Sequence, residues 1–439
     1  MMSLGTQKAP SPSVVLPYYI TASIVFFILT LLMLLSSGSF LGHYFQPHIL
    51  TITHLAALGW GTMIIFGASH QLLPVVMEVH LFSEKLAKWC YILLLPGVVF
   101  LTASFWFFAV GWTLELGALL ILSSIVLYVI NVYRTAKQNE KWTITSECIV
   151  TASWWLLLTA ILGTLLVFNL RYAFFPKDHL YYLKIHAHLG MAGWFLLMIM
   201  GVASRLIPMF LLSHHEPGKA VRVAYYCINI ALIGFLIMAF LFNTEKYWPV
   251  FALTILAGVI SYAIFVKRTF DKGVRTKKMD VPMKVTLTAI GIMFIPFILL
   301  LVIALLPDSA ASTDVTFSLA YGISIIGGFI TAIILGQTFK TLPFIVWMNR
   351  YKKLIGKTKI PLPRDLYEEK LVRYQFYAYI TGYILLLAGV LTHSHWMITI
   401  GCIGLLFTAV CYNVNVFIAV THKIRNIPEL KKTADGVRN

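Results

Sequence analysis

Long apolar stretches follow one another along almost the whole chain, and each is long enough to cross a membrane as a helix. A helix needs about 20 apolar residues to span roughly 30 Å of hydrocarbon. β-barrel strands would instead alternate in polarity over about ten residues. The sequence therefore predicts an all-α membrane protein with twelve transmembrane helices, at about 17–37, 49–76, 86–109, 113–133, 147–169, 184–213, 223–243, 247–267, 284–306, 316–348, 374–392 and 396–420.

The composition agrees with this fold class. Hydrophobic residues make up 59% of the 439 positions and charged residues only 12%. Soluble domains have about 45–50% apolar and about 25% charged residues. Membrane lipid is therefore the first expected partner of the chain.

One pattern of small residues occurs three times. Gly59, Gly67 and Pro74 recur with the same internal spacing in a second and a third copy, at nearly equal distances along the chain. We interpret the chain as three pseudo-symmetric four-helix repeats, because self-similarity at a fixed period is typical of repeated structural units. Repeat 1 covers about 17–140, repeat 2 about 145–275 and repeat 3 about 280–422. The later copies of the pattern are Gly193, Gly201 and Pro208, and Gly328, Gly336 and Pro343.

The basic residues are distributed unequally between the two sides of the predicted bundle. If the N-terminus lies inside, all but four of the 34 Lys and Arg residues fall in inner loops and the tail. Since such residues are retained on the cytoplasmic side, we expect both termini to be cytoplasmic, with a basic tail at 423–439. The net charge of +17 is spread over many loops, so we expect no nucleic-acid partner. The four basic residues of the outer loops are Arg171, Lys177, Lys184 and Lys246.

Five scattered cysteines form no CxxC or CxxCH motif. We therefore expect neither a thiol redox pair nor a covalently attached c-type heme. The stretch from Met1 to Leu16 is polar and rich in proline, so no cleavable signal is predicted.

Histidines stand at the head of two of the three pattern copies. His54 precedes the first copy and His188 the second, whereas Ile323 occupies that position in the third. Because an unpaired polar group in hydrocarbon is costly, we expect these histidines to have a function. His186 is two residues before His188, roughly 200° around a helix, so the two cannot face one small ligand.

One histidine from each of two facing helices suits axial ligation of a heme iron. Our hypothesis is that His54 and His188 hold one heme b. His186 is then left for a second metal, with copper as the candidate, or for a role linked to solvent. His393 and His395, in a short outer turn, are weaker candidates for metal ligands. The alternative is that histidines near the membrane interface are simply hydrated.

Four residues in or beside the first two copies of the pattern are further candidates for the cofactor site. Gly59 and Gly193 leave room for a flat ring, and Trp60 and Trp194 could stack on it. The same residue types also serve close helix packing. Both interpretations are open from the sequence.

Three other polar residues fall within or at the ends of predicted helices. His70 and Glu115 are candidate stations for protons or hydrogen bonds, because ionisable residues inside a membrane are usually functional. Arg205 either extends its head group to the inner surface or holds a propionate or phosphate.

The twelve helices in three units, with histidines in the second and sixth, resemble subunit I of the heme-copper oxidase superfamily. The stretches ITHLAALGW and HAHLGMAGW look like histidine helices of its cytochrome c oxidase and nitric oxide reductase branch. HAHLGMAGWFLLMIMGVASR also resembles the NnrS family of heme- and copper-containing membrane proteins. The resemblance implies three four-helix arcs around three pores.

The chain departs from the oxidase pattern at its metal ligands. In the oxidases the tenth span carries an HxH motif that serves two hemes, whereas the stretch 316–348 has no histidine. The copper pattern of a histidine followed by Pro-Glu is missing from the sixth span. Standard terminal oxidase activity is therefore not expected, and whether the chain is an enzyme stays open.

The sequence and the resemblance together imply a heme-binding protein of the bacterial inner membrane, with copper as a further cofactor to test. Its role would be respiratory electron transfer, with a redox partner, or the handling of nitric oxide or oxygen. The alternative function is a transporter or assembly factor for metal or heme that retains the fold. No oligomeric state is predicted.

Overall fold

The computed structural model describes residues 8–140, 142–242, 247–274, 279–305, 311–355, 357–358 and 360–424. Most of the predicted basic tail at 423–439 lies outside the described residues. All the elements assigned within the described ranges are helices. Twelve helical spans are long and apolar enough to cross a membrane, which confirms the predicted number of spans and their helical structure.

Eight of the spans are continuous helices. Polar side chains mark several of their starts, because a side-chain oxygen can accept a bond from a free N–H of the first turn. Ser83 accepts from the amide of Leu86, and Thr143 accepts from that of Ser146. The continuous helices are α1 (Pro12–Leu35), α4 (Glu84–Trp106), α5 (Trp112–Ala136), α6 (Ile144–Tyr172), α9 (Lys219–Phe240), α10 (Trp248–Asp271), α15 (Glu369–Leu391) and α16 (His395–Thr421).

The other four spans are interrupted, and three of them contain a π-helical segment. The ninth span breaks between two α-helices. In the second, sixth and tenth spans a π segment separates two α-helices. The composite spans are α2 (Pro47–His54), η3 (Leu55–Thr62) and α3 (Met63–Met77); α7 (His179–His188), η4 (Leu189–Leu196) and α8 (Leu197–Phe210); α11 (Val281–Ile292) and α12 (Ile295–Leu305); and α13 (Ala311–Ile323), η5 (Ser324–Ile330) and α14 (Thr331–Tyr351).

The three π segments occupy corresponding places in the sequence. They begin at Leu55, Leu189 and Ser324, and the distances between these starts equal those between the copies of the glycine pattern. Each starts directly after His54, His188 or Ile323. A π turn inserts one extra residue into an α-helix and is common at functional sites. His54 and His188 therefore stand at the point where their helices widen.

The recurring glycines allow each π-containing span to approach the span before it. A Cβ on the second glycine of each copy would lie 2.6 to 2.7 Å from an atom of the preceding span, closer than side chains pack. Small residues at such crossings let helix backbones come together. The contacts are Gly67 with Tyr18 of α1, Gly201 with Cys148 of α6, and Gly336 with Thr286 of α11.

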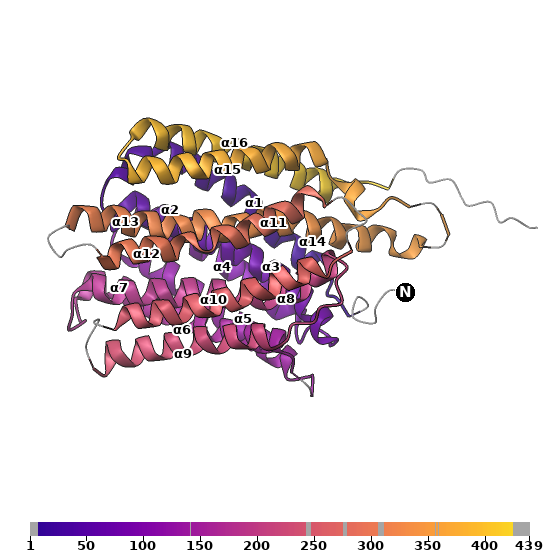
Figure 1. The fold of residues 1–439 in the computed structure, drawn as a ribbon, viewed down its shortest axis with the longest axis horizontal. Coiled ribbons are helices and arrows are strands. Elements are labelled where there is room, and N and C mark those ends of the chain that lie inside the picture. The colour runs from indigo at the N-terminus through magenta and orange to yellow at the C-terminus, as the bar shows by residue number, and fades with distance from the viewer. Residues whose placement is uncertain are drawn as a thin grey trace, which may run out of the picture.

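The long helices lie side by side and form a closed bundle (Figure 1). Each π-containing span packs on the preceding span: α3 on α1, α8 on α6, and α14 on α11. The next two helices form antiparallel pairs, which are α4 with α5, α9 with α10, and α15 with α16. Contacts of α5 with α6, α10 with α12, and α16 with α1 complete the bundle.

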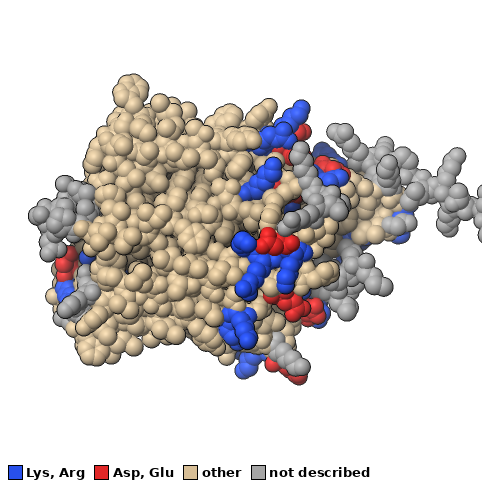
Figure 2. Space-filling view, in the orientation of Figure 1, with Lys and Arg blue, Asp and Glu red and all other residues tan. Residues whose placement is uncertain are grey.

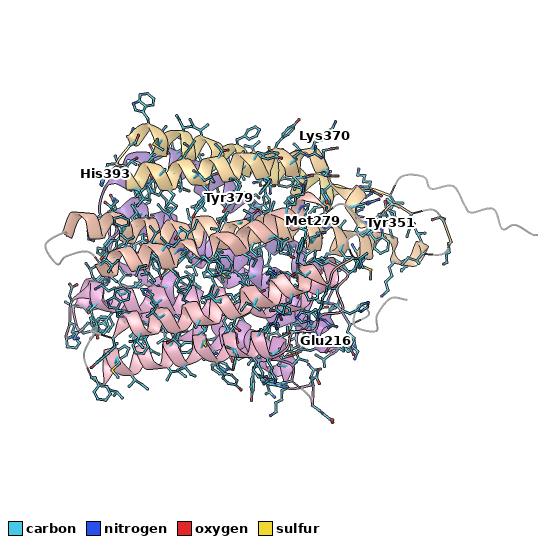
Figure 3. All side chains as sticks on the ribbon, in the orientation of Figure 1. Glu216, Met279, Tyr351, Lys370, Tyr379 and His393 are labelled. Atoms are coloured by element: carbon cyan, nitrogen blue, oxygen red, sulfur yellow. The ribbon has the colours of Figure 1, made fainter. Side chains whose placement is uncertain are left out.

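Charged residues gather at one end of the bundle, and the visible face between the two ends is mostly uncharged (Figure 2). We call the charged end, where Lys370 and Glu216 lie, the basic end (Figure 3). His393 lies at the opposite end, so α15 runs from the basic end to the opposite end. An uncharged girdle of this kind is suited to contact with lipid tails.

Candidate functional site

A cavity of about 1010 Å³ lies inside the bundle, between the π-containing spans. Most of its lining is apolar, with side chains such as Leu232, Phe235 and Ile255. Its walls also include His54, His186 and His188. Cofactor and ligand cavities are usually about 300–1,000 Å³, so this cavity is large enough for a sizeable organic group.

Each of the three cavity histidines is held by a hydrogen bond at Nδ1. His54 bonds the carbonyl oxygen of Leu50 at 2.7 Å, and His188 bonds that of Lys184 at 2.7 Å. His186 bonds the carbonyl oxygen of Thr159, on α6, at 3.0 Å. The first two bonds join residues four apart in one helix, whereas the third joins two helices.

These bonds fix the tautomer of the rings. A carbonyl oxygen can only accept, so Nδ1 of each ring is the donor. In a neutral imidazole the lone pair is then on Nε2. Histidines that bind metals characteristically donate their other ring N–H to a carbonyl or carboxylate in this way. All three rings are therefore prepared to act as ligands or acceptors through Nε2.

His54 and His186 face each other across the cavity. Their ring centroids are 6.5 Å apart and their planes differ by 22°. A metal bound through both Nε2 atoms, at about 2.0–2.1 Å each, would separate the centroids by about 6.3 Å. The observed centroid spacing is therefore close to that of two imidazoles that share one metal centre.

His188 faces a different neighbour. Its ring lies 5.9 Å from that of Tyr321, with an angle of 26° between the planes, and 5.9 Å from Phe235. The structure thus pairs His54 with His186, whereas the sequence hypothesis paired His54 with His188. His186 and His188 point to different neighbours, as their two-residue spacing predicts.

The two ring pairs occupy corresponding positions of the sequence. His188 follows His54 by the offset between the first and second copies of the glycine pattern, and Tyr321 follows His186 by the offset between the second and third. The pair His54–His186 joins the second and sixth spans, and the pair His188–Tyr321 joins the sixth and tenth. Sequence reasoning missed Tyr321, although shifting His186 by the repeat length would have identified it.

Gly163 makes the position of His186 possible. A Cβ on Gly163 would lie 2.7 Å from Cε1 of His186 and 3.1 Å from its Nδ1. Only a residue without a side chain leaves room for the ring at this point of α6. The glycine pattern does not include Gly163, so the sequence offered no signal for it.

The two tryptophans have different surroundings. Trp194 lines the cavity, and its Nε1 donates to Oγ1 of Thr62 at 3.1 Å, which ties η4 to η3. Trp60 is buried in the core, stacked on Phe26 at 4.4 Å and edge-on to Tyr412 at 5.2 Å.

Gly59 and Gly193 are absent from the described cavity lining and serve helix packing. A Cβ on Gly59 would lie 2.7 Å from Val25, and one on Gly193 would lie 2.7 Å from Trp155. The sequence left two roles open for these glycines, namely space for a flat ring and close helix packing. Their observed contacts are those of close helix packing.

His393 and His395 lie away from the described cavity lining. Nε2 of His393 is 3.1 Å from Oγ1 of Thr316, and Nε2 of His395 is 3.3 Å from Oγ of Ser37. In each ring Nε2 is thus hydrogen-bonded to a hydroxyl group.

The three candidate polar stations are also separate from the cavity histidines. His70 is buried among Tyr18, Phe66 and Tyr128, and neither of its ring nitrogens has a partner among the described residues. Glu115 forms an ion pair with Arg171 at 3.2 Å. Arg205 is exposed, as expected for a side chain that reaches the surface of the bundle.

In the described parts of the chain, no three His, Cys, Asp or Glu side chains come close enough to hold a metal ion. The donors that the structure brings together at one point of the cavity are the two imidazoles of His54 and His186. A comparison with models of protein families and a search of curated proteins both find no match to this chain.

Proposed function

We propose that this chain is a heme-binding membrane protein in which His54 and His186 are the two axial ligands. The observation that carries the proposal is the pair of Nδ1-anchored imidazoles facing each other inside a large apolar cavity. A porphyrin supplies four equatorial nitrogens, so two protein ligands complete the coordination of its iron. The donor set and the cavity volume both fit this group.

The residues around the pair position it. The carbonyls of Leu50 and Thr159 hold the two rings at Nδ1 and raise the basicity of Nε2. The bond from Trp194 to Thr62 holds together the two helices that carry the histidines. A heme held by these two histidines would supply one-electron transfer.

Respiratory electron transfer is therefore the first proposed role, and a redox partner is the implied partner. The specific observation that favours handling of nitric oxide or oxygen is the second ring pair. There the ring of His188 lies 5.9 Å from that of Tyr321, so this pair contains only one imidazole. A transporter or assembly factor for metal or heme is the alternative from another class.

The arrangement of the spans supports the proposed division into three repeats. The π segments, the glycine contacts and the order of helix packing each recur with the period of the sequence pattern. Positively charged loops are retained in the cytoplasm, so we propose that the basic end is cytoplasmic. The proposed location is the bacterial inner membrane.

The test is heme content by the pyridine hemochrome method on purified protein. We expect b-type heme in the wild type, and loss of most of it in His54→Ala and in His186→Ala. His188→Ala is the matched control, because this histidine lines the same cavity but pairs with Tyr321. In His188→Ala the heme should stay bound to the imidazoles of His54 and His186.

Two outcomes would contradict the proposal. Heme that persists in the His54→Ala and His186→Ala variants would show that these residues are not ligands. Purified protein with labile iron or copper and no heme would favour the transporter or assembly factor.

A further inference from the structure

Four polar residues line one side of the cavity, two on α7 and two on α13. His188 and Tyr321 are the second ring pair, with ring centroids 5.9 Å apart. Lys184 precedes His188 by four residues, and Ser318 precedes Tyr321 by three, and both also line the cavity. Residues three or four apart share one face of a helix, so each helix presents its two polar groups together. We call these four residues the polar corner.

The polar corner is oriented toward the end of the bundle that is opposite the basic end. Glu216, which follows α8, and Tyr351, where α14 ends, both lie at the basic end (Figure 3). The helices α7 and α13 therefore start at the opposite end, and Lys184 lies nearer to that end than His188 does. Side chains on a helix lean toward its N-terminus, so the stem of Lys184 leans toward the opposite end.

Two atoms of the polar corner are open to the cavity. Nδ1 of His188 donates to the carbonyl oxygen of Lys184, so Nε2 is left to accept. The hydroxyl of Tyr321 can both donate and accept. Neither atom has a partner among the described residues, and neither is sealed in the protein as the hydroxyls of Tyr262 and Tyr383 are. A ligand in the cavity can therefore bond to both.

The rest of this part of the cavity is apolar. Phe235 of α9 lies 5.9 Å from the ring of His188, and Leu232 lines the wall one turn away. Among the residues described as lining the cavity, Lys184 is the one Lys, Arg, Asp or Glu. A few polar groups in an apolar wall fix the orientation of a ligand. One cation beside an apolar wall suits an acidic head group on an apolar chain.

The apolar wall extends to the junction of the second and third repeats. Phe251 and Ile255 of α10 line the cavity on one side of this junction, and Phe297 and Leu300 of α12 line it on the other. The helices α10 and α12 contact each other much less than α5 contacts α6 or α16 contacts α1, the pairs that join the other repeats. A ligand dissolved in the lipid would therefore enter the cavity between α10 and α12.

We propose that the polar corner binds the carboxyl group of a long-chain fatty acid, whose hydrocarbon chain lies along the apolar residues of α9, α10 and α12. The acid donates its O–H to Nε2 of His188 and accepts from the hydroxyl of Tyr321 at its carbonyl oxygen. The charge of Lys184 favours the ionised form of the same group. The site uses neither histidine of the proposed heme pair, so it does not depend on the heme proposal. A bound acid would exclude a gas molecule from the His188–Tyr321 pair.

The test is photo-crosslinking of the purified full-length protein in lipid nanodiscs, with a palmitic acid analogue that carries a diazirine midway along its chain. Mass spectrometry identifies the labelled residues. We expect labels on cavity residues such as Leu232, Ile255 and Leu300, and a several-fold loss of label with excess palmitate. Methyl palmitate lacks the acidic proton and the charge, so it should compete about 10-fold more weakly or less. Label confined to lipid-facing residues, or competition by the ester equal to that by palmitate, would overturn the proposal.

Two variants test the contacts of the head group. Tyr321→Phe and His188→Leu each remove one polar atom of the corner, so labelling of the cavity residues should fall several-fold. Tyr377→Phe, at an exposed residue of α15, and His393→Leu, away from the described cavity lining, are the matched controls and should be labelled like the wild type. Unchanged labelling in both corner variants would overturn the assigned position of the carboxyl group. The competition in the wild type stands even if a variant fails to fold, and heme content of the same samples tests the heme proposal separately.

Discussion

The carbonyl of Thr159 selects which histidine of the HxH motif faces His54. This carbonyl, on α6, accepts from His186 and draws that ring toward the junction of the second and sixth spans. His188 instead bonds the carbonyl one turn back in its own helix, and its ring packs beside Tyr321. A hydrogen bond between helices thus separates the roles of two histidines that are two residues apart.

Gly163→Ala should weaken heme binding without removing a ligand. The new Cβ would lie 2.7 Å from Cε1 of His186, so the ring must move from its place opposite His54. Changes around a metal ligand commonly cost about 10–100-fold in metal affinity, and we expect a loss in this range. The measurement is titration of the apoprotein with hemin.

Gly291→Ala is the control for this substitution. Gly291 lies in α11, and a Cβ there would meet nothing within 4 Å. Its hemin affinity should equal that of the wild type. If Gly163→Ala binds hemin as tightly as the wild type, hemin binding does not require the observed position of the His186 ring.

The π-containing spans are held against their neighbours by equivalent glycine contacts. Gly67→Ala, Gly201→Ala and Gly336→Ala should each destabilise the protein, because each new methyl group overlaps the preceding span. Overpacking of a tight contact costs about 1–3 kcal/mol. Thermal unfolding in detergent checks this, with Gly322→Ala, which meets open space, as the control. If one of the three substitutions left the unfolding temperature almost unchanged, the three glycines would not have equivalent roles.

The segment η5 has its own hydrogen-bond partner in Tyr379. Tyr379→Phe leaves the carbonyls of Gly327 and Gly328 without this donor, so the free energy of unfolding should fall by about 1–3 kcal/mol. Tyr377→Phe, at a residue that is 63% exposed on the same helix, should change it little. Equal unfolding temperatures for the two variants would contradict a structural role of the Tyr379 hydroxyl.

Hydropathy predicted the helices well, because each helix must be about as long as the hydrocarbon layer is thick. The π segments were not predicted, since a local change of helix period leaves no mark in an apolar run. His54, His186 and His188, which the sequence singled out as candidate ligands, all line the cavity. The choice of His186 as the partner of His54 depends on the rotation of α7 and on Thr159, which only the packed structure provides.

The distribution of charge along the bundle predicts its orientation in the membrane. Arg364 lies at the basic end, and Phe107, which is 78% exposed, follows α4 at the opposite end. In intact cells, a membrane-impermeant thiol reagent should label Phe107→Cys and not Arg364→Cys. Four of the five native cysteines are buried and Cys227 is half-buried, so the wild type serves as the background. Labelling of Arg364→Cys alone would reverse the proposed orientation.

The central claim is that His54 and His186 hold one iron between nearly parallel imidazoles. Electron paramagnetic resonance of the oxidised, purified protein tests it most directly, because the spectrum reports the number of axial ligands and the angle between their planes. With planes that differ by 22°, we predict a rhombic low-spin heme signal that disappears in His54→Ala and in His186→Ala. A high-spin signal alone, or a low-spin signal that survives both substitutions, would contradict the claim.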